Sequence, residues 1–183
     1  MLKSAKMLAA ATAVLALAPV AVHAQSKMVG GAPMMASKTI VQNASKASNL
    51  TTLVAAVKAA DLVDTLSGKG PFTVFAPTND AFNMLPAGTV DTLLKPENKA
   101  QLSSMLTYHV VPGKVTAPML IKKIKAGGGT AMLTTVQGGT LTAALSGGKV
   151  VLTDAKGGQS TVTTADVPQS NGVVHVVDHV LMP

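Results

Sequence analysis

The sequence predicts an α+β domain, with helices grouped in the first half of the chain and strands in the second. Apolar residues recur at three- and four-residue steps over much of residues 39–106, which is the spacing of amphipathic helices. Beyond residue 129, short β-type segments are separated by pairs of glycine, and such pairs favour hairpin turns. Because the two kinds of element are segregated and do not alternate, the pattern favours α+β over a parallel α/β sheet.

The first 24 residues predict an export signal that lies outside the fold. Lys3 and Lys6 precede a stretch rich in Ala, Leu and Val, and residues 22–24 (Val-His-Ala) place small side chains at a cleavage site. The stretch is short and Ala-rich for a membrane span, which needs about 20 apolar residues, so an uncleaved anchor is the lesser alternative. We expect a mature chain that starts at Gln25, has no transmembrane anchor, and is periplasmic or secreted to the extracellular space.

Residues 25–36 predict a flexible arm, because a glycine pair and a proline interrupt any periodicity. The arm contains three methionines, Met28, Met34 and Met35. Thioethers are ligands for Cu(I), although methionine serves more often as adaptable apolar packing. A periplasmic small-ligand or Cu(I)-handling protein is therefore a second functional hypothesis beside a binding module.

Residues 37–183 predict one domain. The 159 residues that follow a 24-residue leader in this 183-residue chain are enough for a sizeable core. The chain has no Cys and only four aromatic residues, three Phe and one Tyr. Disulfides are therefore excluded, and the core must be built from Leu, Val, Ile, Ala and Met. We expect a monomer that is held together by packing alone.

Three helices are predicted at the start of the domain. Apolar residues recur at three- and four-residue steps over residues 40–44, 50–57 and 62–66, as on the buried face of a helix. Gly68, the first of two closely spaced glycines, is expected to end the third helix.

A buried strand and a fourth helix follow. Phe72–Ala76 is a short apolar run, and Pro77 is expected to stop it as a strand. Thr78 or Asn79 is expected to cap the next helix, which contains the apolar residues Ala81, Phe82 and Leu85.

Two further helices and a strand complete the first half. Residues 89–94 predict a short helix with Thr89 as its cap, and Pro96 opens the helix that runs to residue 106. Tyr108–Val111 then predicts a strand that ends at a Pro-Gly turn.

One helix and a series of strands are predicted in the second half. Residues 120–126 form a basic amphipathic segment, and Gly147-Gly148 predicts a tight hairpin. The strands are expected at residues 140–146, 149–153, 161–164 and 173–181. The last of them is almost continuously apolar, which predicts a strand buried on both faces.

The charge pattern argues against nucleic-acid binding. Two of the 15 basic residues lie in the leader, so the net charge falls from +7 to +5 on cleavage. All of these residues are Lys, and the chain lacks the Arg that reads base edges. Four aromatic residues also cannot build a base-stacking platform. The one basic cluster, Lys122, Lys123 and Lys125, predicts a solvated face, with attraction to acidic polymers or anionic lipid as the alternative.

The motifs of enzymes and metal sites are missing from the sequence. There is no Gly-x-Ser-x-Gly elbow, and the glycines at 127–129 and 147–148 do not fit a nucleotide-binding loop. Glu97 is the single Glu in the chain. On one strand, His175 and His179 would lie about 13 Å apart, too far to share one ion. We therefore expect no enzyme activity, no cofactor and no metal site.

Three ordered segments resemble the fasciclin (FAS1, beta-Ig-H3) family. Thr73–Phe82 reads TVFAPTNDAF, Tyr108-His109 matches the family's central pair, and Asn171–Asp178 reads NGVVHVVD. The resemblance extends over residues 37–183 and is closest to the secreted single-domain bacterial members. It implies a wedge of two β-sheets with several helices packed alongside.

The resemblance also implies an adhesion-type function and candidate contact residues. In animal members cell binding is assigned to the tyrosine–histidine segment and to an Asp-Ile pair ahead of the last block. The matching positions here are Tyr108, His109, Asp166 and Val167. Val replaces Ile at 167, and the preceding residues differ from the animal motifs. Buried polar groups usually have structural partners, so a structural role stays open for Tyr108 and His109.

The combined expectation is an exported, non-enzymatic interaction module. It would bind an envelope or matrix protein or glycan through its surface loops, with neither nucleic acid nor a cofactor involved. The export signal, the three-block resemblance and the missing catalytic motifs together motivate this hypothesis.

Overall fold

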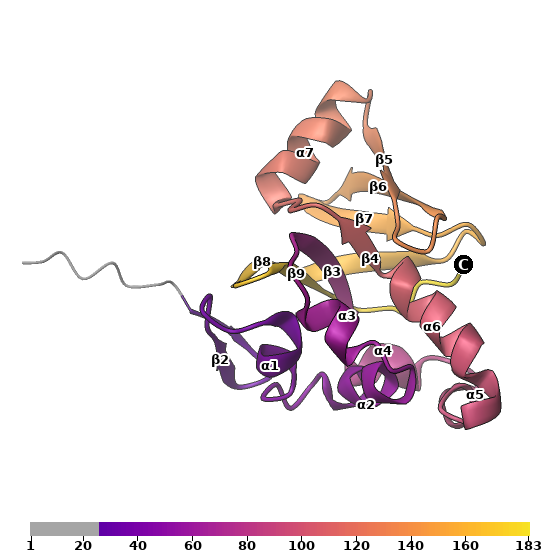
Figure 1. The fold of residues 1–183 in the computed structure, drawn as a ribbon. Coiled ribbons are helices and arrows are strands. Elements are labelled where there is room, and N and C mark those ends of the chain that lie inside the picture. Colours follow the sequence, from indigo (N-terminus) through magenta and orange to yellow (C-terminus); the bar gives the residue numbers. More distant parts are fainter. Residues whose placement is uncertain (1–25) are drawn as a thin grey trace, which may run out of the picture.

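The computed structural model describes residues 26–183 and shows a bent sheet with helices packed along it (Figure 1). The predicted leader, residues 1–24, lies outside the described residues. The α+β class is confirmed: helices dominate the first half of the domain and strands the second. No helix in the described part of the chain is long and apolar enough to cross a membrane.

The helices lie close to their predicted positions. They are α1 (Ile40–Ala44), α2 (Thr51–Ala59), α3 (Val63–Ser67), α4 (Asn79–Asn83), α5 (Thr89–Leu93), α6 (Lys99–Tyr108) and α7 (Ala117–Ala126), with the 3-10 helix η1 (Pro96–Asn98) leading into α6. The Thr78 hydroxyl accepts a hydrogen bond from the Ala81 amide and so caps α4 as predicted. The cap of α5 is Gly88, not Thr89, because a left-handed residue there turns the chain into the helix.

The strands form one seven-stranded sheet and a separate two-stranded hairpin. The strands are β1 (Lys27–Val29), β2 (Ala32–Met34), β3 (Phe72–Pro77), β4 (Val110–Pro112), β5 (Thr130–Thr134), β6 (Thr140–Ser146), β7 (Lys149–Thr153), β8 (Gln159–Gln169) and β9 (Gly172–Val177). The order in the large sheet is β4-β3-β9-β8-β7-β6-β5. Only β3 and β9 run parallel; every other pairing is antiparallel.

The long strand β8 joins the two halves of the wedge. Residues 159–161 of β8 pair with β7, whereas residues 162–169 pair with β9 across two register shifts. Such irregularities bend a strand and increase its twist. The predicted two sheets are therefore two halves of one hydrogen-bonded sheet, bent at β8 (Figure 1).

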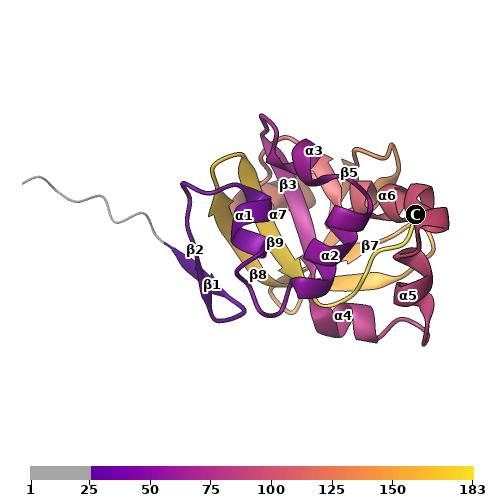
Figure 2. The ribbon, with the colours of Figure 1, turned by 60° about the horizontal axis from the view of Figure 1, so that its bottom comes forward.

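Strands β3 and β9 separate two hydrophobic cores. Helices α1, α2 and α3 lie beside β3 and β9 (Figure 2). Val74 and Ala76 of β3 belong to the core formed with α1–α6, whereas Phe75 belongs to the core between the sheet halves. This alternation follows from the two-residue period of a strand. All six residues of β9 are buried, as predicted, although the strand ends at Val177 and not at residue 181.

The predicted strand Tyr108–Val111 is confirmed only at Val110 and Val111. Tyr108 is the last residue of α6 and His109 caps its C-terminus, so the strand begins only at Val110. His109 lies one turn after Met105, and its ring bonds the Met105 carbonyl. The helical end therefore includes Tyr108 and His109, and the strand takes over at Val110.

The prediction of a flexible arm was also wrong for residues 27–34. Strands β1 and β2 pair in a hairpin, and Gly30 and Gly31 both have positive φ at its turn, which is hairpin geometry. Val29 and Met34 are buried in the helical core, and the hairpin also contacts β8.

The hairpin separates the three methionines that suggested a Cu(I) site. Met34 is 2% exposed and belongs to the core, whereas Met28 and Met35 are 60% and 47% exposed. The thioethers therefore do not share one surface, and the structure gives the Cu(I) hypothesis no support.

We predict that the hairpin stabilises the domain through Met34. Met34→Ala should lower the free energy of unfolding by about 2–4 kcal/mol, since it empties a buried site. The matched variant Met28→Ala should change it by less than about 0.5 kcal/mol, because Met28 is exposed. Urea denaturation of both variants measures the difference, and equal, small effects would show that the segment does not pack on the domain.

Candidate functional site

Tyr108 is a buried structural residue. Its side chain is 0% exposed, and its hydroxyl donates to the Thr140 carbonyl at 2.8 Å and accepts from the Ala155 amide at 3.1 Å. Burial raises the pKa of this phenol, so it stays protonated. The residue ties α6 to the start of β6 and to the turn between β7 and β8.

His109 is equally enclosed and is held as one neutral tautomer. Its Nδ1–H donates to the Met105 carbonyl at 2.9 Å, and its Nε2 accepts from the Leu181 amide at 3.0 Å. A carbonyl can only accept and an amide can only donate, so the ring has a single consistent protonation state. Burial lowers the pKa of His109 to about 4. Neither ring nitrogen is free for a partner or a metal.

We predict an acid sensitivity from this ring. The pKa of His109 is near 6.5 in the unfolded chain and about 4 in the folded protein. The contribution of the neutral ring to the free energy of unfolding is therefore present above pH 6.5 and is lost as the pH falls toward 4. The free energy of unfolding should drop by about 3 kcal/mol over that range, with His175 acting in the same direction because burial lowers its pKa too. Urea denaturation between pH 7 and pH 4 measures the slope, which His109→Gln should reduce. An unchanged slope in that variant would contradict a neutral buried ring.

Asp166 and Val167 also serve the scaffold. Val167 is 1% exposed in the helical core. Asp166 is half-buried in the irregular part of β8, with a positive φ of 54°. Its carboxylate accepts from the Ala117 amide at 2.6 Å, at the first residue of α7, where a negative charge complements the helix dipole.

The buried His175 links Asp166 to the segment that precedes α7. His175 accepts from the Asp166 amide at its Nδ1 (3.2 Å) and donates from its Nε2 to the Val115 carbonyl (2.8 Å). Its ring stacks on Phe75 with centroids 5.5 Å apart. The four predicted contact residues therefore share no accessible surface: three are buried, and Asp166 is already engaged by α7.

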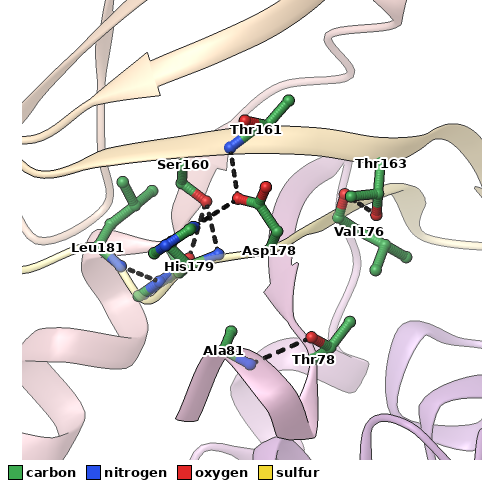
Figure 3. Close-up of polar contacts among 10 residues, drawn as sticks. Thr78, Ala81, Ser160, Thr161, Thr163, Val176, Asp178, His179 and Leu181 are labelled. Carbon is green, nitrogen blue, oxygen red and sulfur yellow. Dashed lines mark hydrogen bonds and ion pairs between the residues drawn. The ribbon is translucent and has the colours of Figure 1, made fainter. Parts of the chain in front are cut away.

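Ser160, Asp178 and His179 lie together but do not form a catalytic triad (Figure 3). The Asp178 carboxylate bonds His179 Nδ1 at 2.8 Å and the Thr161 amide at 2.7 Å. Although partial burial opposes it, these hydrogen bonds lower the pKa of Asp178. The buried Ser160 hydroxyl bonds the backbone carbonyl and amide of His179, not its ring. A triad needs the imidazole to take the serine proton, so this cluster anchors the end of β9.

A depression of about 520 Å³ lies between α7 and β5, and a groove of about 490 Å³ lies among four loops. Loops from four parts of the chain form this groove, between α3 and β3, between β8 and β9, before α1, and after β4. The lining residues are Thr39, residues 67–71, Lys114 and residues 169–172. We call this groove the loop groove. Two of its lining residues are Lys, and none is acidic.

Asn171 holds the loops of the groove together. Its side-chain oxygen accepts from the Ile40 amide at 3.2 Å, and its Nδ2 donates to the carbonyls of Leu66 at 2.7 Å and Gly68 at 3.2 Å. One buried amide therefore bonds the start of α1 and the end of α3, which would otherwise leave unpaired backbone groups.

Close backbone contacts fix the groove floor. A Cβ on Gly70 would lie 2.0 Å from the Asn171 carbonyl oxygen, and one on Gly172 would lie 1.9 Å from that of Phe72. The Gly113 amide donates to Pro71 at 2.9 Å and the Ser170 amide to Lys38 at 2.9 Å. The walls are therefore tied to one another by main-chain hydrogen bonds.

Sequence reasoning missed the groove residues. No motif in the sequence singles out Lys69, Lys114, Ser67 or Ser170. The available signal was local: Lys69 lies between two glycines and Lys114 follows Pro-Gly. Both places are loops beside the paired strands β3, β4 and β9.

Two apolar cavities lie under α1 and α2, with volumes of about 30 and 20 Å³. Ile40, Ala44, Leu53 and Val74 line both of them. A volume of this size is about that of one water molecule, so these cavities are packing gaps within the core.

Comparison with known proteins gives one family. The model of the Fasciclin domain family matches residues 48–183. Protein sll1483 of Synechocystis is 49% identical over 168 residues, which covers 92% of this chain and 86% of that protein. The immunogenic protein MPB70 of Mycobacterium bovis is 36% identical over 154 residues, covering 81% of this chain and 71% of that protein.

A cell-surface protein and a solved structure extend the comparison. The cell surface glycolipoprotein MPB83 of Mycobacterium bovis is 36% identical over 159 residues, covering 84% of this chain and 64% of that protein. A FAS1 domain pair from the insect cell adhesion molecule Fasciclin I superposes with a TM-score of 0.71 at 19% identity. The match covers 80% of this chain and 51% of the pair, so this chain spans about half of that structure.

Proposed function

Because the chain belongs to the fasciclin domain family, as the match over residues 48–183 shows, we propose that it is an exported, non-enzymatic interaction module. It binds an envelope or matrix partner through surface loops, and the loop groove is the contact region. The family membership makes an adhesion-type module the general expectation, and the structure supports the choice of loops.

This proposal rests on one contrast: some polar residues are hydrogen-bonded inside the fold, and others are exposed in the loop groove. The family-like segments contain four polar residues whose side chains already make internal hydrogen bonds: Tyr108, His109, Asn171 and His175. Lys69 and Lys114 instead line an open groove and are exposed. Loops on a rigid scaffold are the usual place for binding residues, which supports the groove as a surface available to a partner.

The absence of enzyme activity is proposed on the same basis. In residues 26–183, no group of three or more His, Cys, Asp or Glu is placed to hold a metal ion. The one Ser-His-Asp cluster has its serine bonded to backbone. A nucleophile needs a base within reach of its proton, and this serine has none.

The predicted leader and one named relative support export and surface exposure. The leader predicted over residues 1–24 would carry the chain across a membrane, and one relative is named as a cell surface glycolipoprotein. We place this protein in the periplasm or outside the cell on these grounds.

Affinity retention tests the proposal. The mature protein, purified with a C-terminal tag, should retain at least one polymer or protein from an envelope extract of its host, whereas heat-unfolded protein on the same support should not. Protease treatment of intact cells then separates the two locations, since only a surface-exposed chain is cleaved. Failure to retain any component of the extract, with the fold verified by circular dichroism, would overturn the proposal.

A further inference from the structure

We propose that the loop groove binds a negatively charged saccharide, a sugar unit that carries a carboxylate or a sulfate. This inference rests on the proposed function, because it names the chemistry of the partner for that same region. It follows from the charge, the size, the lining and the rigidity of the groove.

The charge of the groove selects an anion. Lys69 and Lys114 line it, with no Asp or Glu among the lining residues. The Lys–carboxylate ion pairs found in residues 26–183 involve Lys95 and Lys99, at a distance in sequence from these loops. Two lysines without acidic neighbours in a concave site raise the local concentration of anions and offer charge-assisted hydrogen bonds to carboxylate or sulfate oxygens.

The size and the lining favour a sugar over other anions. A volume of about 490 Å³ lies in the usual range of small-ligand sites, about 300–1,000 Å³, and exceeds the needs of a single small anion. Thr39, Ser67 and Ser170 carry hydroxyl groups and line the groove; the Thr39 hydroxyl already accepts from the Gln42 amide and keeps its proton to donate. These groups both donate and accept hydrogen bonds, which is what a ring with many hydroxyls requires.

The same lining disfavours the other anionic partners. No aromatic residue and no Leu, Ile, Val or Met lines the groove, so it lacks a pocket for the apolar anchors that dominate peptide recognition. It has no aromatic platform for nucleic-acid bases and no Arg fork for phosphate. An acidic peptide is therefore the less favoured occupant, and it becomes an arm of the test.

The groove is built before any ligand arrives. The Asn171 side chain bonds the loops at Ile40, Leu66 and Gly68. The backbone of residues 70 and 172 is in direct contact with neighbouring main chain. Because these loops are already ordered, binding loses little conformational entropy.

The basic face of α7 provides a matched control. Lys122 and Lys123 are exposed, like Lys69 and Lys114, but they lie on α7, where Lys123 and the exposed Met132 line a separate depression of about 520 Å³. Reversing two lysines at either place changes the net charge equally. The pair of variants therefore separates a local site from general attraction to a positive protein.

Calorimetric titration of the mature protein tests the inference. The probes are oligogalacturonate, a sulfated oligosaccharide of similar length, a neutral oligosaccharide and poly-glutamate. We expect one or both charged saccharides to bind, the neutral one not to bind, and added salt to weaken binding. Lys69→Glu with Lys114→Glu should weaken binding at least tenfold, whereas Lys122→Glu with Lys123→Glu should change it less than twofold. Thermal unfolding confirms that both variants are folded.

The outcomes distinguish this inference from the proposed function. The groove assignment would be overturned if both variants lost saccharide affinity equally, or if only the α7 variant lost it. Groove-dependent binding of poly-glutamate that exceeds saccharide binding would overturn the saccharide assignment. If no charged saccharide binds while the wild-type protein still retains envelope material, the inference fails and the proposed function stands. If no charged saccharide binds and the wild-type protein retains no envelope material, both the inference and the proposed function fail.

Discussion

Replacing Tyr108 with Ala is expected to lower the free energy of unfolding by about 4 kcal/mol, because it removes a buried aromatic ring from the core between the sheet halves. The side chain is 0% exposed and packs in that core with Phe75 and Val177. The substitution also leaves the Thr140 carbonyl and the Ala155 amide without their present partner. A loss of this size is a large share of the stability of an ordinary domain, about 5–15 kcal/mol.

The matched variant Tyr108→Phe separates the ring from its hydroxyl. It keeps the packing and removes two hydrogen bonds, so we expect a loss of about 1–2 kcal/mol. Urea denaturation measures both variants, and retention of the envelope partner is measured under conditions in which each is folded. Folded Tyr108→Phe should bind like wild type. If Tyr108→Ala keeps full stability but loses the partner, Tyr108 is a contact residue and its structural role is refuted.

The second large effect is expected at Gly172. An added Cβ would lie 1.9 Å from the Phe72 carbonyl oxygen, and Phe72 is the residue that pairs with Gly172 in the parallel β3–β9 ladder. The two central strands must separate to accept a methyl group. We expect Gly172→Ala to cost about 3 kcal/mol or more, at the upper end for overpacked sites.

Gly148→Ala serves as the control for this substitution. Gly148 has a φ of +79° in the β6–β7 turn, and its added Cβ would meet no atom within 4 Å. The cost there should be about 1 kcal/mol, from backbone strain alone. Thermal unfolding of the two variants gives the comparison. Equal, small decreases in the melting temperature of the two variants would mean that the close contact between β3 and β9 is relaxed in solution.

Local patterns predicted most of the helical layer and the β6–β7 hairpin correctly. The apolar period over residues 40–66 gave α1 to α3, and Thr78 was named as a possible cap of α4, a role that its hydroxyl fills. These features depend on neighbours within four residues, which a sequence displays directly. The same holds for the Gly147-Gly148 turn between β6 and β7.

The errors arose where tertiary contacts decide the structure. Residues 27–34 read as an arm because their strands are three residues each, too short to show a period. What holds them in place is the burial of Val29 and Met34 against distant helices. Tyr108 looked like part of a strand because its partners, Thr140 and Ala155, lie 32 and 47 residues away.

The loop groove was beyond sequence reasoning for the same reason. Four loops from residues 39 to 172 assemble it, and the bonds from Asn171 to Ile40 and Leu66 extend over 131 and 105 residues. In the family-like segments, Tyr108, His109, Asn171 and His175 make hydrogen bonds inside the scaffold. The groove lysines, Lys69 and Lys114, lie outside those segments.

The central claim is that the family-like polar residues build the scaffold and the loop groove makes the contact. The most direct test is an amide NMR titration of isotope-labelled mature protein with the envelope fraction that it retains. We expect the perturbed amides to cluster at Thr39, residues 67–70, Lys114 and residues 169–172. Perturbations centred on α7 or on another face, with these loops unchanged, would contradict the account.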